Sequence, residues 1–386
     1  MLPLFALLIG FIAFFTLYLA LFTVAGLFSK PQKTNHEVTK QRRFALFLPA
    51  YKEDAVIVES AQNALKQLYP TDLVEIIVIA DSLKPETLQA LRQLPIQTVE
   101  VQFETSTKSK ALNAAMQFLS TKYDENYFDV ALILDADNHL EPQFLSKINA
   151  SFDQGWRVVQ GHRTAKNTDT TTALLDAVSE EINNTIFRLG HRALGLSCAL
   201  IGSGMAFEYG LFKSLMADIQ TTGGFDKELE MRLLSNKIKV EYVQDAYCYD
   251  EKVRNLQVFE KQRTRWIAAQ VKYLKHNFWA GLAALFKGNF DYADKVFQTL
   301  IPPRILLLGI SGIIWFLAFV SQTLVWFSTI QLLVLMGTLV LAMPSQLRNQ
   351  IGWSELKSLP KLFFSFLISF TKIKDAQKKF IHTPHG

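Results

Sequence analysis

The sequence predicts an α/β domain that is built on a parallel β-sheet and flanked by transmembrane helices. Three observations predict this architecture. Apolar runs alternate with helical patterns between residues 44 and 160, which is typical of parallel strands covered on both faces. Two stretches, residues 1–29 and 305–347, contain no charged residue. Charged residues make up only 19% of the chain, below the roughly 25% of soluble domains, because of those stretches.

Residues 1–29 form the first predicted element, an N-terminal transmembrane anchor. A bilayer core needs about 20 apolar residues as a helix, and this run is rich in Leu, Phe and Ala. A cleaved signal peptide is the competing interpretation, but such a peptide begins with basic residues and has a shorter apolar region. We therefore expect the segment to be retained.

Residues 30–275 form the predicted cytosolic domain, in which strands and helices alternate. The expected strands are 44–49, 74–80, 98–103, 130–134 and 156–160, and the expected helices are 55–67, 85–92, 108–119 and 142–152. Ligands of open α/β sheets bind beyond the carboxyl ends of the strands. The polar residues expected at those ends are Tyr51, Glu53, Asp81, Asp135 and Asp137.

The C-terminal part is predicted to return to the membrane. Residues 276–304 are expected to form interfacial helices and residues 305–347 a transmembrane hairpin, with its break near residues 326–329, because the run would extend about 65 Å as one helix. Residues 348–386 are expected to form an interfacial helix and a basic tail, although a fourth span over 359–370 stays open. Basic residues flank both membrane segments, which places the domain in the cytoplasm.

Several protein classes are excluded. Two cysteines, Cys198 and Cys248, do not make a disulfide scaffold. A net charge of +5 gives nucleic-acid binding little support. The glycine fingerprints of dinucleotide dehydrogenases and P-loop NTPases are missing from the sequence.

Asp135 and Asp137 lie two residues apart at a predicted strand end, so their side chains point the same way. Two such carboxylates can hold a hard cation such as Mg²⁺ or Mn²⁺ and, with it, a diphosphate. Taken alone, the pair also fits a solvated strand end, because Asp-x-Asp occurs by chance in many proteins.

Asp226 follows the glycine turn at residues 223–224. Two interpretations are open for this aspartate: it is the N-cap of a helix, or it is a general base that faces a cleft. Glu228 and Glu230 are competing acids, but they are expected to lie inside the helix.

Gln262, Arg265 and Trp266 share one face of a predicted helix. The guanidinium suits a phosphate group and the indole suits a sugar ring. The alternative is a helix beside the membrane, where Arg snorkels and Trp lies at headgroup level. Upstream, Gly202-Ser-Gly204 is either a backbone that a ligand approaches closely or a simple turn.

The motifs occur in a fixed order: Leu48–Glu53, Ile79–Asp81, Lys108–Asn113, Asp135-Ala-Asp137, Gly202–Met205, Phe225-Asp226 and Gln262-x-x-Arg265-Trp266. As an ordered set, the chain resembles the family-2 membrane glycosyltransferases, which include cellulose, hyaluronan and chitin-like polymer synthases and ceramide glucosyltransferase. The resemblance covers residues 44 to about 270. It implies a GT-A-type, Rossmann-like domain.

The resemblance implies a role for each matching residue. The implied nucleotide-sugar-binding residues are Ala50, Tyr51, Glu53, Asp81, Lys108, Asp135 and Asp137. The implied metal ligands are Asp137 and Asp135, the implied base is Asp226, and the implied acceptor and diphosphate contacts are Gly204, Gln262, Arg265 and Trp266. Mg²⁺ or Mn²⁺ is the implied cofactor and a UDP-sugar the implied donor.

The sequence departs from the family pattern before the base. The Thr-Glu pair that normally precedes it is Gly224-Phe225 here, which leaves Glu228 as a fallback, while Arg232 supports the register. Three spans are also few for a polymer exporter. His382 lies in a tail segment that resembles those of the family.

The implied reaction is an inverting, metal-dependent transfer of a sugar to a membrane-associated lipid or glycan acceptor by a polysaccharide-synthase-like enzyme. A single-sugar lipid glycosyltransferase and an inactive membrane scaffold are the alternatives. The expected partners are the nucleotide sugar, the acceptor, the lipid bilayer and an export or oligomer partner, but no nucleic acid. The resemblance implies a bacterial inner membrane and a cytoplasmic active site.

Overall fold

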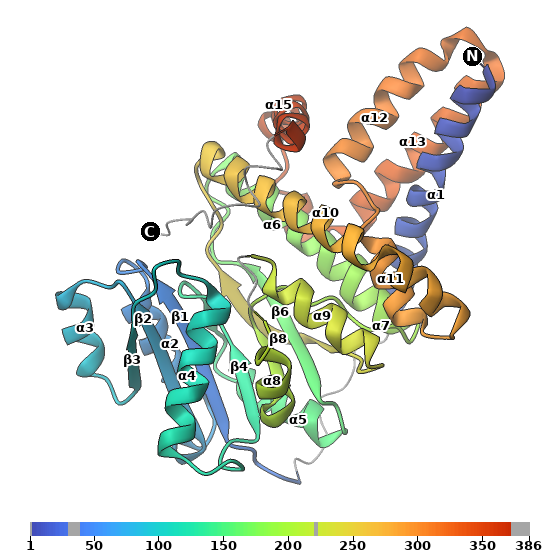
Figure 1. Ribbon diagram of the computed structural model, residues 1–386. Helices are drawn as coiled ribbons and strands as arrows, with labels where there is room; N and C mark the ends of the chain where they lie inside the picture. Colours follow the sequence, from blue (N-terminus) through green and yellow to red (C-terminus); the bar gives the residue numbers. More distant parts are fainter. Residues whose placement is uncertain (1, 30–38, 220–222, 372–386) are drawn as a thin grey trace.

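The computed structural model describes residues 2–29, 39–219 and 223–371. Within these residues an eight-stranded sheet runs in the order β3-β2-β1-β4-β7-β6-β8-β5. Helices cover both faces of the sheet, and a group of apolar helices stands beside it (Figure 1).

The strands are β1 (Phe44–Tyr51), β2 (Val74–Asp81), β3 (Gln97–Val101), β4 (Val130–Ile133), β5 (His139–Leu140), β6 (Val158–Ala165), β7 (Met205–Glu208) and β8 (Glu241–Asp250). The helices of the domain are α2 (Ile57–Ala64), α3 (Pro85–Arg92), α4 (Lys108–Lys122), α5 (Phe144–Asp153), α6 (Thr171–Asn183), α7 (His191–Ala193), α8 (Tyr209–Met216) and α9 (Phe225–Ser235). The remaining α-helices are α1 (Leu2–Leu27), α10 (Leu256–Phe286), α11 (Phe290–Gln298), α12 (Arg304–Leu317), α13 (Gln322–Ala342), α14 (Ser345–Arg348) and α15 (Trp353–Thr371). Short 3₁₀ segments cover Thr71–Leu73 and Ala318–Val320, and a π-helix, η2, covers Asn184–Gly190.

The prediction of a parallel sheet is correct for β1 to β4 and for the pair formed by β6 and β8, but not for the whole sheet. Strands β1, β2, β3 and β4 pair in parallel. Strand β7 then enters between β4 and β6 and is antiparallel to both, and β5 is antiparallel to β8. The Gly-Ser-Gly turn at residues 202–204 explains the reversal, because it delivers the chain to the carboxyl end of β4 and sends it back along that strand.

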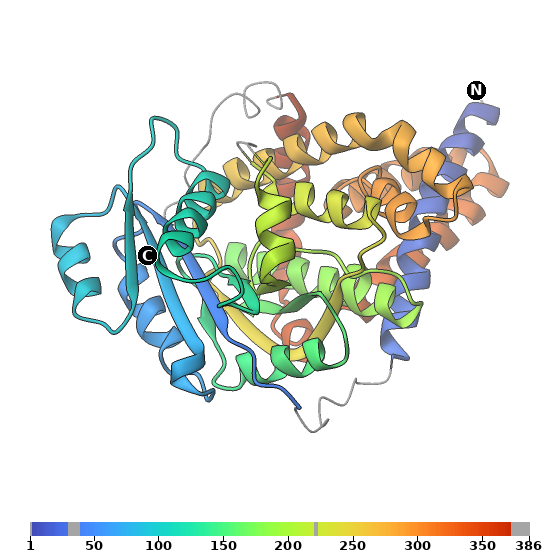
Figure 2. The ribbon, with the colours of Figure 1, turned by 60° about the horizontal axis from the view of Figure 1, so that its bottom comes forward.

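Side-chain alternation along β1 builds a core on each face of the sheet. Ala45 and Phe47 face the layer of α4, α8 and α9. Phe44 and Leu46 face the layer of α2 and α5. All four are fully buried, and each large side chain contributes about 1.5–3 kcal/mol by leaving water. The two cores hold the strand ends in a fixed relation to one another. Figure 2 shows the helices packed on the two sides of the strands.

Helix α10 is continuous over 31 residues, from Leu256 to Phe286. The domain boundary expected at residue 275 therefore falls inside a helix. The change of composition near Phe278 reflects exposure of apolar side chains, not an end of the helix. Because α10 also carries Gln262, Arg265 and Trp266, the motif is rigidly joined to the apolar part of the molecule.

Helices α1, α12 and α13 pack together beside the domain (Figure 1). In the described residues, Phe5–Leu27 and Gln322–Ala342 are long and apolar enough to cross a bilayer by length and composition, and Arg304–Val320 is a shorter apolar segment. Leu19 and Leu335 are buried inside the bundle, whereas Phe11 and Phe316 point outward with 58% and 71% of their surface exposed.

The break between α12 and α13 differs from the expected one at residues 326–329. The chain turns at residues 318–321, where the Ser321 amide donates to the Ala318 carbonyl at 3.0 Å. The bulky residues at 326 and 327 instead lie on the exposed face of α13. The extended backbone of Ser321, at φ −150° and ψ 124°, ends the first helical segment and begins α13 without a side-chain cap.

Helix α1 lies unusually close to η2. A Cβ added to Gly190 would stand 2.0 Å from the Phe22 carbonyl oxygen, and one added to Gly26 would stand 2.8 Å from the Thr185 carbonyl oxygen. Two glycines that face each other thus allow backbone contact between the N-terminal helix and the domain.

Helix α15 spans Trp353–Thr371, longer than the 359–370 segment expected from sequence, and it packs on α10 and α12. The basic tail and His382 lie outside the described residues.

Candidate active site

Asp135 and Asp137 follow the carboxyl end of β4. The Asp135 amide donates to Ser203 Oγ and Asn138 Oδ1, both at 3.0 Å, which fixes the turn against the loop before β7. Asp137 is 1% exposed, and its Oδ2 accepts from the Glu251 amide at 2.9 Å. The two carboxylates therefore share one strand end, but Asp135 is the more open of the two.

Lys108, the first residue of α4, joins this turn to the glycine loop. Its Nζ is ion-paired with Asp135 Oδ1 and donates to the Gly202 carbonyl at 2.8 Å. Gly202 has a left-handed φ of +84°, and a Cβ there would stand 3.7 Å from the Asp226 carboxyl carbon. A continuous series of neighbouring groups therefore runs from Asp135 through Lys108 and Gly202 to Asp226.

Asp226 is the second residue of α9, and the N-cap position belongs to Gly224 at φ 70° and ψ 37°. The N-cap interpretation of Asp226 is therefore excluded. Within the described ranges its side chain has no recorded hydrogen bond or ion pair. A partly exposed carboxylate at a helix N-terminus is available to a ligand.

The competing acids have partners. Glu228 Oε1 accepts from Arg232 Nε at 2.9 Å, one turn along α9. Glu230 is 1% exposed and pairs with Lys295 Nζ at 2.7 Å. The geometry therefore favours Asp226 over the fallback Glu228.

The ends of β1 and β2 bring the predicted nucleotide residues together. Tyr51 and Asp81 are register partners in adjacent strands. Asp81 is buried and accepts from Ser82 Oγ at 3.0 Å. Ala50 is 1% exposed in the core, so its side chain does not face the edge. Glu53 is buried too, and its carbonyl accepts from the amide of Ile57, the first residue of α2.

Arg265 of α10 reaches toward Asp135. Burial lowers the pKa of the Arg265 guanidinium, and the negative charge of Asp135 only partly offsets that effect. A guanidinium beside this carboxylate can donate to two phosphate oxygens at once. The arrangement suits a phosphate-bearing ligand.

Trp266 and Gln262 complete the α10 motif. Trp266 is 37% exposed, and the Arg263 guanidinium carbon lies 4.0 Å from its ring centroid. The buried Gln262 Oε1 has no hydrogen-bond partner in the described part of the chain. One face of the indole is therefore covered by Arg263, a residue that the sequence motif does not single out.

Gly204 lies deeper than expected. A Cβ on Gly204 would stand 3.1 Å from Cys248 Cβ, and the Gly204 carbonyl accepts from the Gly161 amide at 2.8 Å. Gly204 thus joins sheet strands, and Gly202 is the glycine that lies beside Asp226.

A buried ion network that the sequence did not predict supports Asp135. Arg163 Nη1 lies 3.7 Å from Asp135 Oδ2, and Arg163 Nε donates to Glu180 Oε1 at 2.6 Å. Lys252 is ion-paired with Glu180 and, at 2.7 Å, with Asp250. These side chains come from β6, α6, the end of β8 and the segment just after it, so no local spacing reveals them. The sequence signal is limited to an arginine and an acid within apolar elements.

The same helix, α6, holds α10 in place. Asp176 of α6 is ion-paired with Arg263 of α10. Within the described ranges, no group of three or more His, Cys, Asp or Glu side chains has metal-site geometry. A cation at this edge would therefore be coordinated by Asp135, Asp137 and the oxygen atoms of a bound ligand.

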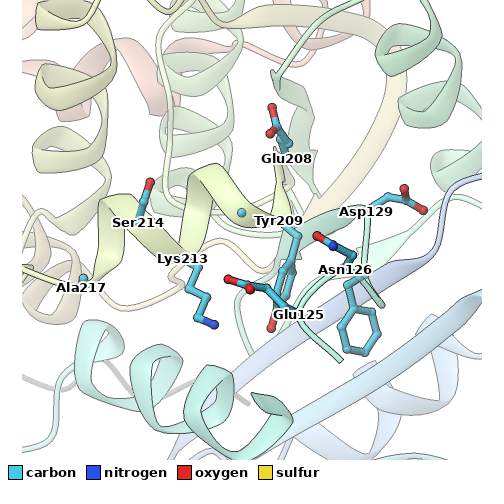
Figure 3. Close-up of a pocket in the computed structure, with 10 residues that line it drawn as sticks. Glu125, Asn126, Asp129, Glu208, Tyr209, Lys213, Ser214 and Ala217 are labelled. Atoms are coloured by element: carbon cyan, nitrogen blue, oxygen red, sulfur yellow. The ribbon is translucent and has the colours of Figure 1, made fainter. Parts of the chain in front are cut away.

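A hollow of about 560 Å³ lies away from this edge (Figure 3). It is lined by residues at the amino end of β4 and on α8, among them Glu125, Asp129, Glu208, Tyr209 and Lys213. None of the predicted site residues lines it.

A curled α/β sheet with a nucleotide-binding edge is the fold of GT-A glycosyltransferases. The sequence model of a family described as "Glycosyltransferase like family 2" matches residues 41–269, more than half of the chain. The chain therefore belongs to the family-2 glycosyltransferases and has a GT-A fold.

Known relatives are distant. The probable glycosyltransferase YdaM of Bacillus subtilis is 22% identical over 227 residues, which cover 58% of this chain and 54% of YdaM; the chain spans about half the length of this curated relative. The mannosyltransferase PcManGT of Pyrobaculum calidifontis, solved with GDP-Man and Mn²⁺, has a TM-score of 0.54 at 17% identity and covers 89% of this chain and 97% of its own. TarS of S. aureus, solved with UDP-GlcNAc, has a TM-score of 0.43 at 14% identity, covering 86% of this chain and 91% of its own.

Proposed function

We propose that the chain is an inverting, metal-dependent glycosyltransferase that moves a sugar from a nucleotide sugar, a UDP-sugar by family resemblance, to a membrane-associated acceptor. One observation carries the proposal: Asp135, Lys108, Gly202 and Asp226 form a continuous set at the carboxyl edge of the sheet. Donor-side and acceptor-side groups thus lie within one site. Tyr51 and Asp81 hold the nucleotide at the adjoining strand ends.

The proposed cation fits the residues present. Mg²⁺ and Mn²⁺ favour carboxylate and phosphate oxygens, and such sites commonly use one or two carboxylates plus the substrate's phosphates. Asp137 and Asp135 supply the two carboxylates, with Lys108 and Arg163 compensating Asp135. A bound cation would neutralise charge on the leaving diphosphate.

Asp226 accepts the proton from the acceptor hydroxyl in the proposed reaction. The acceptor oxygen forms a bond to the anomeric carbon while the bond from that carbon to the diphosphate breaks, so the configuration inverts and the nucleoside diphosphate leaves. Arg265, whose guanidinium is buried near Asp135, stabilises the diphosphate charge. Gly202 leaves room beside the base because it has no side chain.

The acceptor is proposed to arrive from a bilayer. Helix α10 carries Trp266 and continues toward the apolar bundle, and Trp279 and Phe286 at its far end are 75% and 83% exposed. Aromatic residues of this kind are favoured at headgroup level. We place α1, α12 and α13 in the membrane and the sheet on the cytoplasmic side, in a bacterial inner membrane by resemblance.

Polymer synthesis and single-sugar transfer to a lipid are the two candidate outcomes. The bundle favours the second, because Leu19 and Leu335 fill its interior and are 0% exposed. The buried polar side chains of the same interior, Thr16, Ser311 and Gln331, are hydrogen-bonded to one another, so the described interior is filled by packed apolar groups and paired polar groups. A polymer product would then need an export partner, whereas a glycolipid would not.

A transfer assay tests the proposal. The purified chain in lipid nanodiscs is given Mg²⁺ or Mn²⁺, radiolabelled UDP- and GDP-sugars and membrane lipid extract, with Asp137→Ala as the blank. A labelled, glycosidase-sensitive ladder means polymer synthesis, and one organic-extractable spot means lipid glycosylation. Failure of every donor to label any product, with the protein shown to be folded, would overturn the proposal and favour the scaffold.

A further inference from the structure

Two arginines meet one face of α6 where the apolar helix α12 begins. Asp176, Ser179 and Asn183 are spaced three and four residues apart along α6, so they line one face. Arg263 of α10 is ion-paired with Asp176. Arg304, the first residue of α12, donates to Asn183 Oδ1 and, at 2.8 Å, to the Ser179 carbonyl. The two guanidinium groups are thus held by the same face of α6.

Positive charge exceeds negative charge at this junction. Arg304 has only neutral partners among the described residues, namely Asn183 and Ser179. Glu180, one residue further along α6, is engaged by Arg163 and Lys252 and does not supply the missing charge. Asp176 is therefore the carboxylate that pairs directly with one of these two arginines.

Arg263 has an unused donor. It is 8% exposed, and its Nε lies buried with no hydrogen-bond partner in the described part of the chain. Burial lowers the pKa of the Arg263 guanidinium, and the carboxylates of Asp176 and Glu180 only partly offset that effect. A buried donor without an acceptor is costly unless a ligand supplies one.

The N-terminus of α12 adds further donors. The helix has 14 residues and begins after Pro303 without a side-chain cap. The amides of Leu306 and Leu307 both donate to the Pro303 carbonyl, which leaves the amides of Arg304 and Ile305 as the donors of the first turn, and the helix dipole favours an anion there. Arg304 itself is partly exposed, so an anion can reach the junction from outside.

We propose that Arg304, Arg263 and the N-terminus of α12 bind the phosphate group of a membrane lipid. Phosphate suits the fork of a guanidinium, which donates to two oxygens at once. A lipid is the source because the uncharged run of α12 starts at Ile305, directly after Arg304, which places the junction at the expected edge of the bilayer. Arg263 also stacks on Trp266, so the phosphate would lie beside the motif at the acceptor side.

This inference rests on the proposed membrane placement and deepens it by naming the chemistry of the lipid. A binding experiment without nucleotide sugar or cation keeps its outcome separate from that of sugar transfer. The full chain in detergent micelles is titrated with dioleoyl phosphatidic acid, with dioleoylglycerol, which has the same chains but no phosphate, and with inorganic phosphate. Bound lipid is measured by native mass spectrometry.

We expect phosphatidic acid to bind at least about tenfold more tightly than dioleoylglycerol and than inorganic phosphate. Arg304→Gln should reduce the preference over dioleoylglycerol to within about threefold. Arg348→Gln, which makes the same charge change at an exposed arginine of α14, is the matched control and should leave the preference unchanged.

Three results would overturn the inference. Equal binding of the two lipids would show that no phosphate site exists. An equal loss in Arg304→Gln and Arg348→Gln would show unspecific attraction to anionic lipid. Inorganic phosphate that binds as tightly as phosphatidic acid would assign the site to a free anion. If Arg304→Gln does not fold, Arg304→Lys takes its place in the titration, because it keeps the positive charge but loses the two-pronged guanidinium. An unchanged preference for phosphatidic acid in Arg304→Lys would contradict the proposed geometry.

Discussion

Glu180→Gln tests whether the buried ion network stabilises the domain. Glu180 is 5% exposed and accepts from Arg163 Nε at 2.6 Å, while its other oxygen is paired with Lys252. The amide keeps the shape but removes the charge. Lys252 retains Asp250 at 2.7 Å, whereas the remaining carboxylates near Arg163 lie 3.7 and 3.9 Å away.

Removing one partner from a buried ion pair leaves an uncompensated charge, so we expect a loss of about 3–5 kcal/mol in the free energy of unfolding. The assay is urea unfolding of the chain in detergent micelles, followed by circular dichroism. Glu208→Gln is the matched control. Its pair with Arg157 Nε is 2.5 Å long, but the two side chains are 47% and 50% exposed, which predicts a loss of about 0–1 kcal/mol.

The comparison isolates burial, because the substitution and the type of pair are the same in both variants. A difference of less than about 1 kcal/mol between Glu180→Gln and Glu208→Gln would refute the reasoning.

Three further predictions follow from single positions. Gly202→Ala should lower the transfer rate about tenfold or more. The control is Gly195→Ala, at a φ of +75° with no atom within 4 Å of the added Cβ, which should only lose about 1–2 kcal/mol of stability from backbone strain. Equal transfer rates in the two variants would contradict the role of the Gly202 site. Gly190→Ala should destabilise the chain by about 2–4 kcal/mol in urea unfolding because its Cβ meets backbone, and Gly210→Ala, with open space, should not. Burial raises the pKa of Glu181, but its interactions with His162 and its other hydrogen bonds lower that pKa more, so the net direction is downward. The ionised Glu181 should therefore stabilise the folded chain above about pH 4.5, and this stabilisation should be lost as the pH falls below that value. An unfolding midpoint that depends on pH equally in the wild type and in Glu181→Gln would contradict this prediction.

The parallel half of the sheet was predictable because each strand is a continuous apolar run that ends at a polar residue. Strand β1 and its neighbours β2 and β4 follow this pattern. Strands β5 and β7 were not predictable, because they are two and four residues long and depend on partners distant in sequence. Their antiparallel direction is set by turns and pairing, not by a local period.

The site shows the same division. Residues named by motifs, such as Asp135, Asp226 and Arg265, lie around one edge because strand ends and helix starts meet there. The supporting side chains Arg163 and Glu180 were missed, since a buried charge pair has no periodic signature. The sequence predicts Gly204 as a ligand contact, whereas Gly202 lies beside Asp226, because spacing alone does not show which glycine faces the base.

The most direct test of the central claim is the effect of Asp226→Asn on sugar transfer. Single-turnover transfer is measured with the donor and acceptor found active for the wild type, and binding of the nucleoside diphosphate is measured in parallel. Asp218→Asn, at an exposed position of the same domain, is the control. We predict a fall in rate of about 10²–10⁴-fold for Asp226→Asn, with nucleotide binding changed less than about threefold. Transfer by Asp226→Asn at the rate of Asp218→Asn would contradict the assignment of Asp226 as the base.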